Sequence, residues 1–263
     1  MSTPMTTRAE LRRAPVLGGL NRTVLGLELR RMLRNRRTVI FTLIMPIALF
    51  LLIGTNESYV HEDAGNGNVS AYIMISMAVY GAVLATTSGG AMVSIERALG
   101  WSRQLRLTPL APAAYIATKM MIALVLGLGS VLAVYMVGMA TGKPSMPVHV
   151  WILTALIGWV GSLVFAAFGL FMGYVLPGEN VMQVLGPLMA VFAFVGGLFV
   201  PLEDGSTLQT VAQFTPMYGL AELARSPLTG ETVQVSWVLN IVVWLVIFAG
   251  GAAWRFRRDT ARV

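Results

Sequence analysis

Residues 70–93 read SAYIMISMAVYGAVLATTSGGAMV, a run without a single charged side chain. A bilayer with a hydrocarbon core of about 30 Å needs about 20 apolar residues in each helix that crosses it, so this segment is long enough to span a membrane. Comparable segments occupy residues 38–55, 113–140, 150–175, 181–200 and 236–254. The sequence therefore predicts an all-α integral membrane protein with six transmembrane helices, of which the first is short and contains Pro46.

The composition of the whole chain agrees with this class. Of the 263 residues, 56% are hydrophobic and 12% are charged, and the mean hydropathy is +0.71. Soluble domains carry about 25% charged residues, so a soluble globular protein is excluded. The chain contains no cysteine, which excludes disulfides, thiolate metal sites and a cysteine nucleophile.

The positions of the basic residues predict the orientation. Nine of the 19 lysines and arginines precede residue 38, and more lie between spans two and three and after span six, whereas Lys143 and Arg225 alone fall on the opposite side. Basic residues concentrate on the cytoplasmic side of membrane proteins. We therefore expect a multi-pass protein of the bacterial plasma membrane with both termini in the cytoplasm, and we interpret the net charge of +7 as membrane orientation rather than nucleic-acid binding.

Three segments outside the spans also have predicted roles. Residues 1–19 are expected to form a flexible cytoplasmic tail, and residues 20–37 a basic amphipathic helix at the lipid headgroups. Between spans five and six, LQTVAQF and YGLAELA have helical spacing and predict two short helices that dip towards the outer leaflet. The prolines expected to delimit them are Pro201, Pro216 and Pro227.

Enzymatic motifs are missing from the chain. His61 and His149 lie in separate loops without HExxH spacing, no GxSxG occurs, and GMATGK at 138–143 lacks the spacing and the Ser/Thr of a phosphate-binding loop. The predicted spans contain no ionisable residue except Lys119, which lies near a span end and is expected to reach the interface. Energy for transport is therefore expected to come from another protein.

The most distinctive segment is SIERALGWSRQLRLTPLAPAAYIATK, residues 94–119. One interpretation is a charged linker on the membrane surface. The other is a short helix presented to a cytoplasmic partner, in which Gly100 permits close approach or a bend and Pro109 fixes the exit.

This segment resembles the cytoplasmic signature of ABC-2 type transporter permeases, in which E-R-x-x-G runs into L-x-x-T-P-L. It is especially similar to permeases of multidrug and antibiotic exporters of the daunorubicin-resistance type, although Ala98-Leu99 departs from the usual charged residues. The stretch FTPMY at 214–218 and the helix before span one also resemble the family. The matching signature residues are Glu96, Arg97, Gly100, Trp101, Leu105, Leu107, Thr108, Pro109 and Leu110.

The resemblance implies a division of labour. Residues 20–263 would form one ABC-2 transmembrane domain that works as a dimer, either with itself or with a related permease. A separate ATP-binding cassette subunit would bind ATP and magnesium, and this chain would need no cofactor or metal. Contacts with that subunit would involve Glu96, Arg97, Gly100, Trp101, Arg103, Leu105, Thr108 and Pro109, and the helix before span one would contribute Arg30, Arg31 and Arg34.

The family further implies export of a hydrophobic or amphipathic drug-like compound along a path lined by spans one, two and five. An exporter of a lipid or polysaccharide is the alternative with the same fold. A non-transporting membrane module and an ion-coupled carrier are the remaining classes, and the latter needs a buried ionisable residue. Gly169 and Gly173 form a GxxxG pair, for which we expect packing within the chain rather than a dimer interface.

Overall fold

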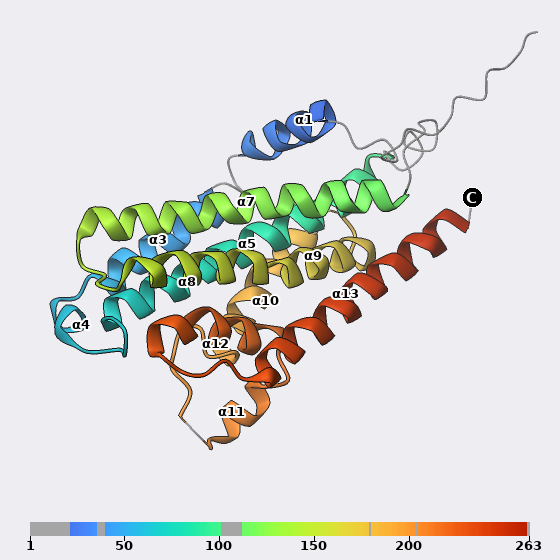
Figure 1. The fold of residues 1–263 in the computed structure, drawn as a ribbon. Helices are drawn as coiled ribbons and strands as arrows, with labels where there is room; N and C mark the ends of the chain where they lie inside the picture. The colour runs from blue at the N-terminus through green and yellow to red at the C-terminus, as the bar shows by residue number, and fades with distance from the viewer. Residues whose placement is uncertain (1–21, 36–39, 101–111, 179, 204, 262–263) are drawn as a thin grey trace, which may run out of the picture.

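The computed structural model describes residues 22–35, 40–100, 112–178, 180–203 and 205–261, and in these ranges the chain is helical, with one isolated β-bridge between Asp63 and Asn68 (Figure 1). The helices are α1 Arg22–Leu33, η1 Ile40–Ile44, α3 Met45–Leu49, η2 Phe50–Gly54, α4 Glu57–His61, α5 Val69–Ala98, α7 Pro112–Thr141, α8 Val148–Gly161, α9 Leu163–Val175, α10 Val181–Val195, α11 Thr207–Ala212, α12 Pro216–Thr229 and α13 Val235–Ala261.

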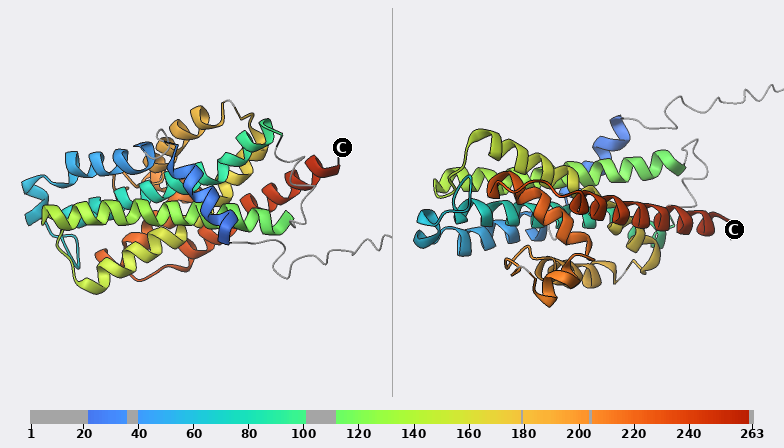
Figure 2. Two further views of the ribbon diagram at one scale, coloured as in Figure 1. Left: turned by 90° about the horizontal axis from the view of Figure 1, so that it is seen from above. Right: turned by 60° about the horizontal axis from the view of Figure 1, so that its bottom comes forward.

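Helix α5 lies at the centre of the bundle, between α7 and α9 (Figures 1 and 2). Its N-terminus is capped by Asn68, whose side-chain oxygen accepts a hydrogen bond of 3.0 Å from the amide of Ala71. Side chains are buried on all sides along most of its length. By contrast, α13 exposes a broad apolar face, so α5 alone of the long helices is enclosed by protein.

Glycines allow α9 to approach α5 at backbone distance. A methyl group placed on Gly90 of α5 would lie 2.6 Å from the amide nitrogen of Leu170, and one on Gly169 of α9 would lie 2.8 Å from the carbonyl carbon of Thr87. Gly173 is similarly close to the backbone of Ala91. The expectation that the GxxxG pair packs within the chain is therefore confirmed.

Four of the six predicted spans are confirmed as helices long and apolar enough to cross a membrane: Val69–Ala98, Tyr115–Thr141, Val148–Val175 and Val235–Phe256. The segments expected as spans one and five form shorter apolar helices, Ile40–Gly54 and Val181–Val195. The first is irregular, because π-helical turns lie on both sides of α3, which has Pro46 in its first turn. At 1.5 Å per residue, each would extend only about 22 Å as an α-helix.

Several predicted boundaries are corrected. The helix of the second predicted span extends beyond residue 93, because α5 continues to Ala98 and includes the first charged residues of the segment expected outside the membrane. The fourth span is divided at Ser162 into α8 and α9. The fifth ends at Val195, where Gly196 and Gly197 begin a turn, instead of at residue 200.

The helices predicted outside the spans are present in part. Helix α1 lies across α7 (Figure 2) within the predicted range 20–37, and α11 and α12 correspond to LQTVAQF and YGLAELA. Pro227 does not end a helix as expected, because α12 continues to Thr229. The tail at 1–19 and the signature residues Trp101, Arg103, Leu105, Leu107, Thr108, Pro109 and Leu110 lie outside the described residues.

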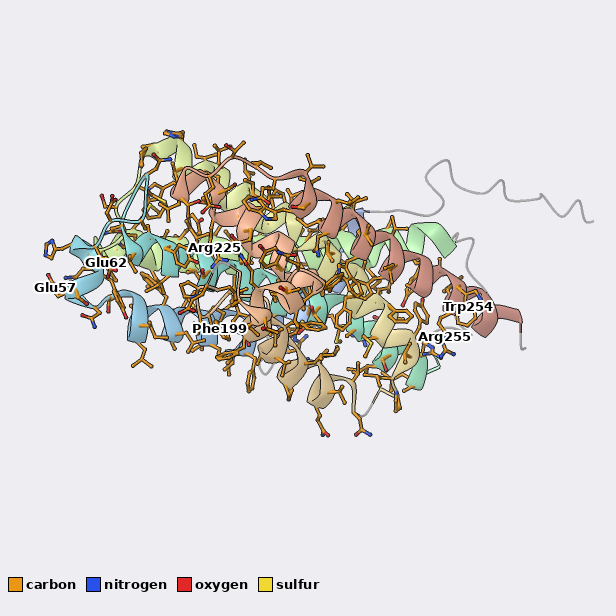
Figure 3. The ribbon with its side chains drawn as sticks, turned by 90° about the horizontal axis from the view of Figure 1, so that it is seen from below. Glu57, Glu62, Phe199, Arg225, Trp254 and Arg255 are labelled. Carbon is orange, nitrogen blue, oxygen red and sulfur yellow. The ribbon has the colours of Figure 1, made fainter. Side chains whose placement is uncertain are left out.

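The two ends of the bundle differ in charge. Glu57 of α4 and Glu62, which follows that helix, lie at one end, whereas Arg255 and the C-terminal part of α13 lie at the other (Figure 3). Both cations expected on the outer side are neutralised: Lys143 pairs with Glu57, and Arg225 pairs with Glu222. The segregation agrees with the orientation predicted from the sequence, so we call these the acidic end and the basic end.

The glycine contact between α5 and α9 makes a testable prediction. Gly90→Ala places its methyl group against backbone atoms that cannot rotate away, and overpacking of this kind costs about 1–3 kcal/mol. We expect a clear fall in the melting temperature of the purified protein in detergent. Gly129→Ala on α7 is the matched control, because no atom lies within 4 Å of the added methyl. Equal melting temperatures of the two variants would contradict close packing of α5 on α9.

Candidate functional site

A cleft of about 750 Å³ lies between η1 and α3, α5, and α10. These are the segments predicted as spans one, two and five. Its walls are apolar side chains, among them Phe41, Met45 and Leu84, interspersed with neutral polar groups such as Thr87 and Gln183. No charged side chain is among the described residues that line it. The volume is within the range of pockets that hold drug-sized molecules.

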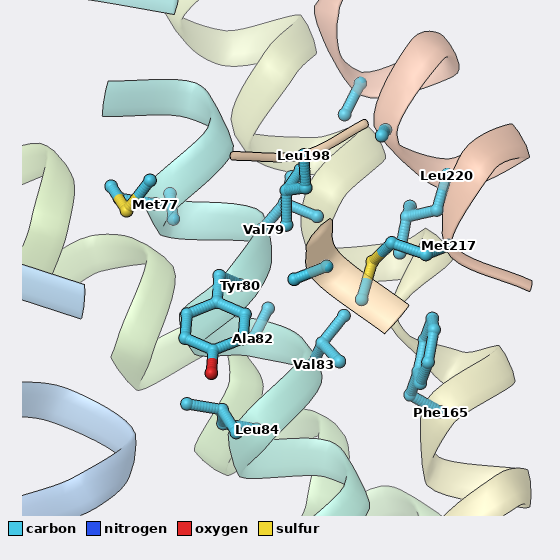
Figure 4. Packing of buried hydrophobic residues seen from close by; sticks show 14 of the residues in the cluster. Met77, Val79, Tyr80, Ala82, Val83, Leu84, Phe165, Leu198, Met217 and Leu220 are labelled. Atoms are coloured by element: carbon cyan, nitrogen blue, oxygen red, sulfur yellow. The ribbon is translucent and has the colours of Figure 1, made fainter. Parts of the chain in front are cut away.

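The cleft begins near the basic end of the bundle and stops near the middle. Ile95 lines it close to the end of α5, and Tyr80 lines it roughly 22 Å further along that helix, at 1.5 Å per residue. The Tyr80 ring stands edge-on to Phe199 with centroids 4.8 Å apart. Beyond Tyr80, Met77 and Met74 are almost completely buried, and Figure 4 shows Leu198 packed beside Val79 there. The cleft is therefore closed towards the acidic end.

The turn that carries Phe199 is held by Arg225 of α12. The Arg225 guanidinium is 2% exposed and donates hydrogen bonds to the carbonyl oxygen of Gly197 at 2.9 Å and the hydroxyl of Tyr72 at 2.5 Å. It also pairs with Glu222 at 2.6 Å and lies over the Tyr72 ring, 4.7 Å from its centroid. These contacts connect α12, α5 and the turn after α10 at the closed side of the cleft.

A second charged cluster lies at the basic end, around Glu96. Its carboxylate is 3% exposed and accepts hydrogen bonds from Lys119 Nζ at 2.5 Å and from the Tyr115 hydroxyl at 2.5 Å. Arg31 of α1 lies 3.4 Å from the same carboxylate. The expectation that Lys119 extends to the interface is wrong, because its side chain is 4% exposed and its charge is satisfied by Glu96.

The remaining predicted site residues within the described ranges have different surroundings. Arg97 donates to the carbonyl oxygens of Gly173 and Tyr174 at the end of α9. Gly100 has a φ of +76° and open space around its Cα. The positive φ of Gly100 supports its predicted role in a change of chain direction at the end of α5, and its predicted close approach to a partner stays a prediction.

On α1, Arg30 and Arg34 are exposed, whereas Arg31 faces Glu96. Met32 is buried against Met92 and Ile122, with Leu29 beside them. The apolar face of this helix thus packs on the bundle close to the basic end of the cleft.

Sequence reasoning missed the burial of Glu96 and Lys119, although a signal existed. Glu96 and Lys119 are opposite charges, one near the end of α5 and the other in the first part of α7, and two consecutive helices packed side by side can bring such residues together. Arg225 had a weaker signal, a single cation in an apolar helical segment with Glu222 three residues before it. The residues that line the cleft gave no such signal in the sequence.

A comparison with Lys143 tests the importance of Arg225. Arg225→Ala leaves Glu222 and the Gly197 carbonyl without their partner in a buried site, and loss of one member of a buried pair costs about 3–5 kcal/mol. Lys143→Ala removes a pair in which Glu57 is 72% exposed, and solvent-exposed pairs contribute little to stability. Melting in detergent should therefore show a much larger decrease for Arg225→Ala, and a decrease no larger than that of Lys143→Ala would contradict the structural role.

Comparison with known proteins gives two matches. The family model described as "ABC-2 type transporter" matches residues 20–229. The protein "Putative transport permease YvfS" of Bacillus subtilis (strain 168) is 26% identical over 230 residues, which cover 84% of this chain and 90% of that relative.

Proposed function

The chain belongs to the ABC-2 type transporter family, and we propose that it is the membrane permease subunit of an ATP-binding cassette exporter. In this proposal, two permease copies, identical or related, assemble with two ATPase subunits in the bacterial plasma membrane with their termini in the cytoplasm. The ATPase subunits bind ATP and magnesium. The permease moves a hydrophobic or amphipathic compound, such as a drug or antibiotic, out of the cytoplasm or the inner leaflet.

The cleft between η1/α3, α5 and α10 is the observation that carries this proposal. It is closed beyond Tyr80 and extends to the basic end of the bundle. If the basic end is cytoplasmic, as the distribution of lysine and arginine predicts, a compound enters from the cytoplasm or from the inner leaflet. Export then requires the contact of Tyr80 with Phe199 to open.

The chemistry of the walls supports an uncharged or weakly polar substrate. Met45, Met182 and Met189 all line the cleft, and flexible thioether side chains adapt to apolar surfaces of different shapes. Thr87 and Ser88 add hydroxyl groups without charge. A phosphate-bearing lipid headgroup favours cationic side chains, which the described lining residues do not provide. A drug-like compound therefore fits these walls better than a lipid with a phosphate-bearing headgroup, and an oligosaccharide remains the alternative for the test below.

Filling the cleft provides a direct test. We expect Ser88→Trp to reduce ATP-dependent export by about tenfold or more, because a bulky indole occupies the substrate volume. Val246→Trp on α13 is the control, since Val246 is 65% exposed on the outer face of the bundle. Transport is measured in proteoliposomes that contain the ATPase subunit, with drugs, lipids and oligosaccharides as separate substrates.

Co-purification of the ATPase subunit separates a blocked cleft from a lost complex. Both tryptophan variants should retain the ATPase in full. Unchanged drug export by Ser88→Trp contradicts the cleft as the path, and export of lipid or oligosaccharide but no drug supports the alternative substrate.

The predicted coupling segment has its own test. Arg103→Glu combined with Leu105→Asp reverses one charge and removes one apolar contact in the segment expected to dock on the ATPase, so co-purification of the ATPase should fall severalfold. Glu231→Arg, an exposed position near the acidic end, should leave it unchanged. Full co-purification with the double variant contradicts the coupling assignment.

A further inference from the structure

Glu96 lies at the C-terminal end of α5, opposite the beginning of α7. Helix α5 ends at Ala98, two residues after Glu96, and Gly100 has a positive φ. Helix α7 begins at Pro112 and carries Tyr115 and Lys119 in its first turns. Hydrogen bonds of 2.5 Å from both residues to Glu96 therefore connect the end of one helix to the beginning of the other.

Arg97 attaches the same end of α5 to its opposite neighbour. Its guanidinium donates to the carbonyl oxygens of Gly173 and Tyr174 at 3.2 and 3.1 Å and lies over the Tyr174 ring. Ser94 adds a 2.8 Å hydrogen bond to the carbonyl oxygen of Leu176. Two adjacent charged residues thus hold α5 between α7 on one side and α9 on the other.

Burial makes these contacts unsuited to binding another protein. Glu96 is 3% exposed and Lys119 is 4% exposed, so neither reaches the surface in this conformation. A charged pair in a low-dielectric region depends on close geometry and on complete hydrogen bonding. Apolar side chains could slide past one another with little loss, whereas a displaced charge pair leaves two buried charges unsatisfied. The ends of α5 and α7 are therefore constrained to move together.

The end of α5 that is held by Glu96 also contributes to the cleft and contacts α1. Ile95, next to Glu96, is one of the residues that line the cleft, and Arg31 of α1 lies 3.4 Å from the Glu96 carboxylate. The end of α5 is thus connected to a wall of the cleft through Ile95 and to α1 through one ion pair.

We propose that Glu96 is a positioning residue which, with Lys119 and Tyr115, joins α5 and α7 into a single lever that transmits the movement of the coupling segment to the cleft. The inference rests on the proposed function, since it requires an ATPase that moves this segment. It assigns Glu96 to a contact within the chain, in place of the contact with the ATPase that the sequence resemblance implies.

The test replaces the charged pair by apolar residues of similar size. Glu96→Leu combined with Lys119→Met keeps the site filled, and such replacements of buried pairs are often neutral for stability. Arg31 loses its partner Glu96 in this variant, but its side chain is exposed enough to be hydrated. We expect the double variant to fold, to bind the ATPase and to hydrolyse ATP, but to export at least about fivefold fewer substrate molecules per ATP hydrolysed. The single variant Lys119→Arg keeps a positive charge opposite Glu96, and it should retain most of the export per ATP of the unmodified protein.

The matched control makes the same replacement in the other Lys–Glu pair. Glu57→Leu with Lys143→Met lies at the acidic end, and should leave the number of molecules exported per ATP unchanged. Tyr115→Phe removes one hydrogen bond to Glu96 with a minimal change of shape, and a measurable loss of coupling is expected from it even if the double variant is too unstable to purify.

The outcomes distinguish this inference from the proposed function. Normal export per ATP by the Glu96/Lys119 double variant, or by Tyr115→Phe should the double variant not fold, overturns the lever. Loss of the ATPase from the folded double variant also overturns it, because Glu96 then contacts the ATPase. Failure of the unmodified protein to bind any ATPase or to transport overturns the proposed function itself.

A distance measurement tests the lever without transport. The chain has no cysteine, so Ala98→Cys with Ala117→Cys, both at exposed positions, introduces spin labels at the ends of α5 and α7 without background. The short distance within one chain should be the same with and without ATP in the complex. In the Glu96/Lys119 double variant it should broaden or change with ATP, and an equally narrow distance there overturns the inference.

Discussion

The close approach of α7 and α9 to α5 is the constraint on which the structure depends. In a membrane, apolar side chains gain little by leaving lipid for protein, so helices associate through close packing, for which small residues are needed. Gly89 and Gly90 allow α7 and α9, respectively, to reach the α5 backbone, and Gly169 and Gly173 do the same from α9. Substitution at these contacts affects every helix that uses α5 as its support.

The central position of α5 explains why the charged residues of this helix lie at its C-terminal end. Glu96 and Arg97 lie where α5 packs closely on α7 and α9, so each must be satisfied by neighbouring groups. Glu96 is matched by Lys119, Tyr115 and Arg31, and Arg97 by the carbonyl groups that end α9. The same helix forms a wall of the cleft, which connects the packing constraint with the proposed transport.

The apolar periodicity and length of the segments were sufficient to predict an all-helical membrane protein, the four long spans and the helices that precede and follow them. The sequence places the end of the second span at residue 93, whereas α5 continues as a helix to Ala98. Glu96 is accommodated there because Lys119 on another helix neutralises it, and such partners depend on tertiary structure. The division at Ser162 and the shortness of Val181–Val195 also escaped prediction, because both segments are continuously apolar.

The buried charges bear on the source of energy for transport. An ion-coupled carrier uses ionisable residues that face the substrate or an ion pathway. Glu96, Lys119 and Arg225 are buried, but none is among the described residues that line the cleft, and each has a counter-charge within the chain. These three charges are therefore engaged with partners within the chain, and it is membership of the ABC-2 type transporter family that implies an ATPase partner as the source of energy.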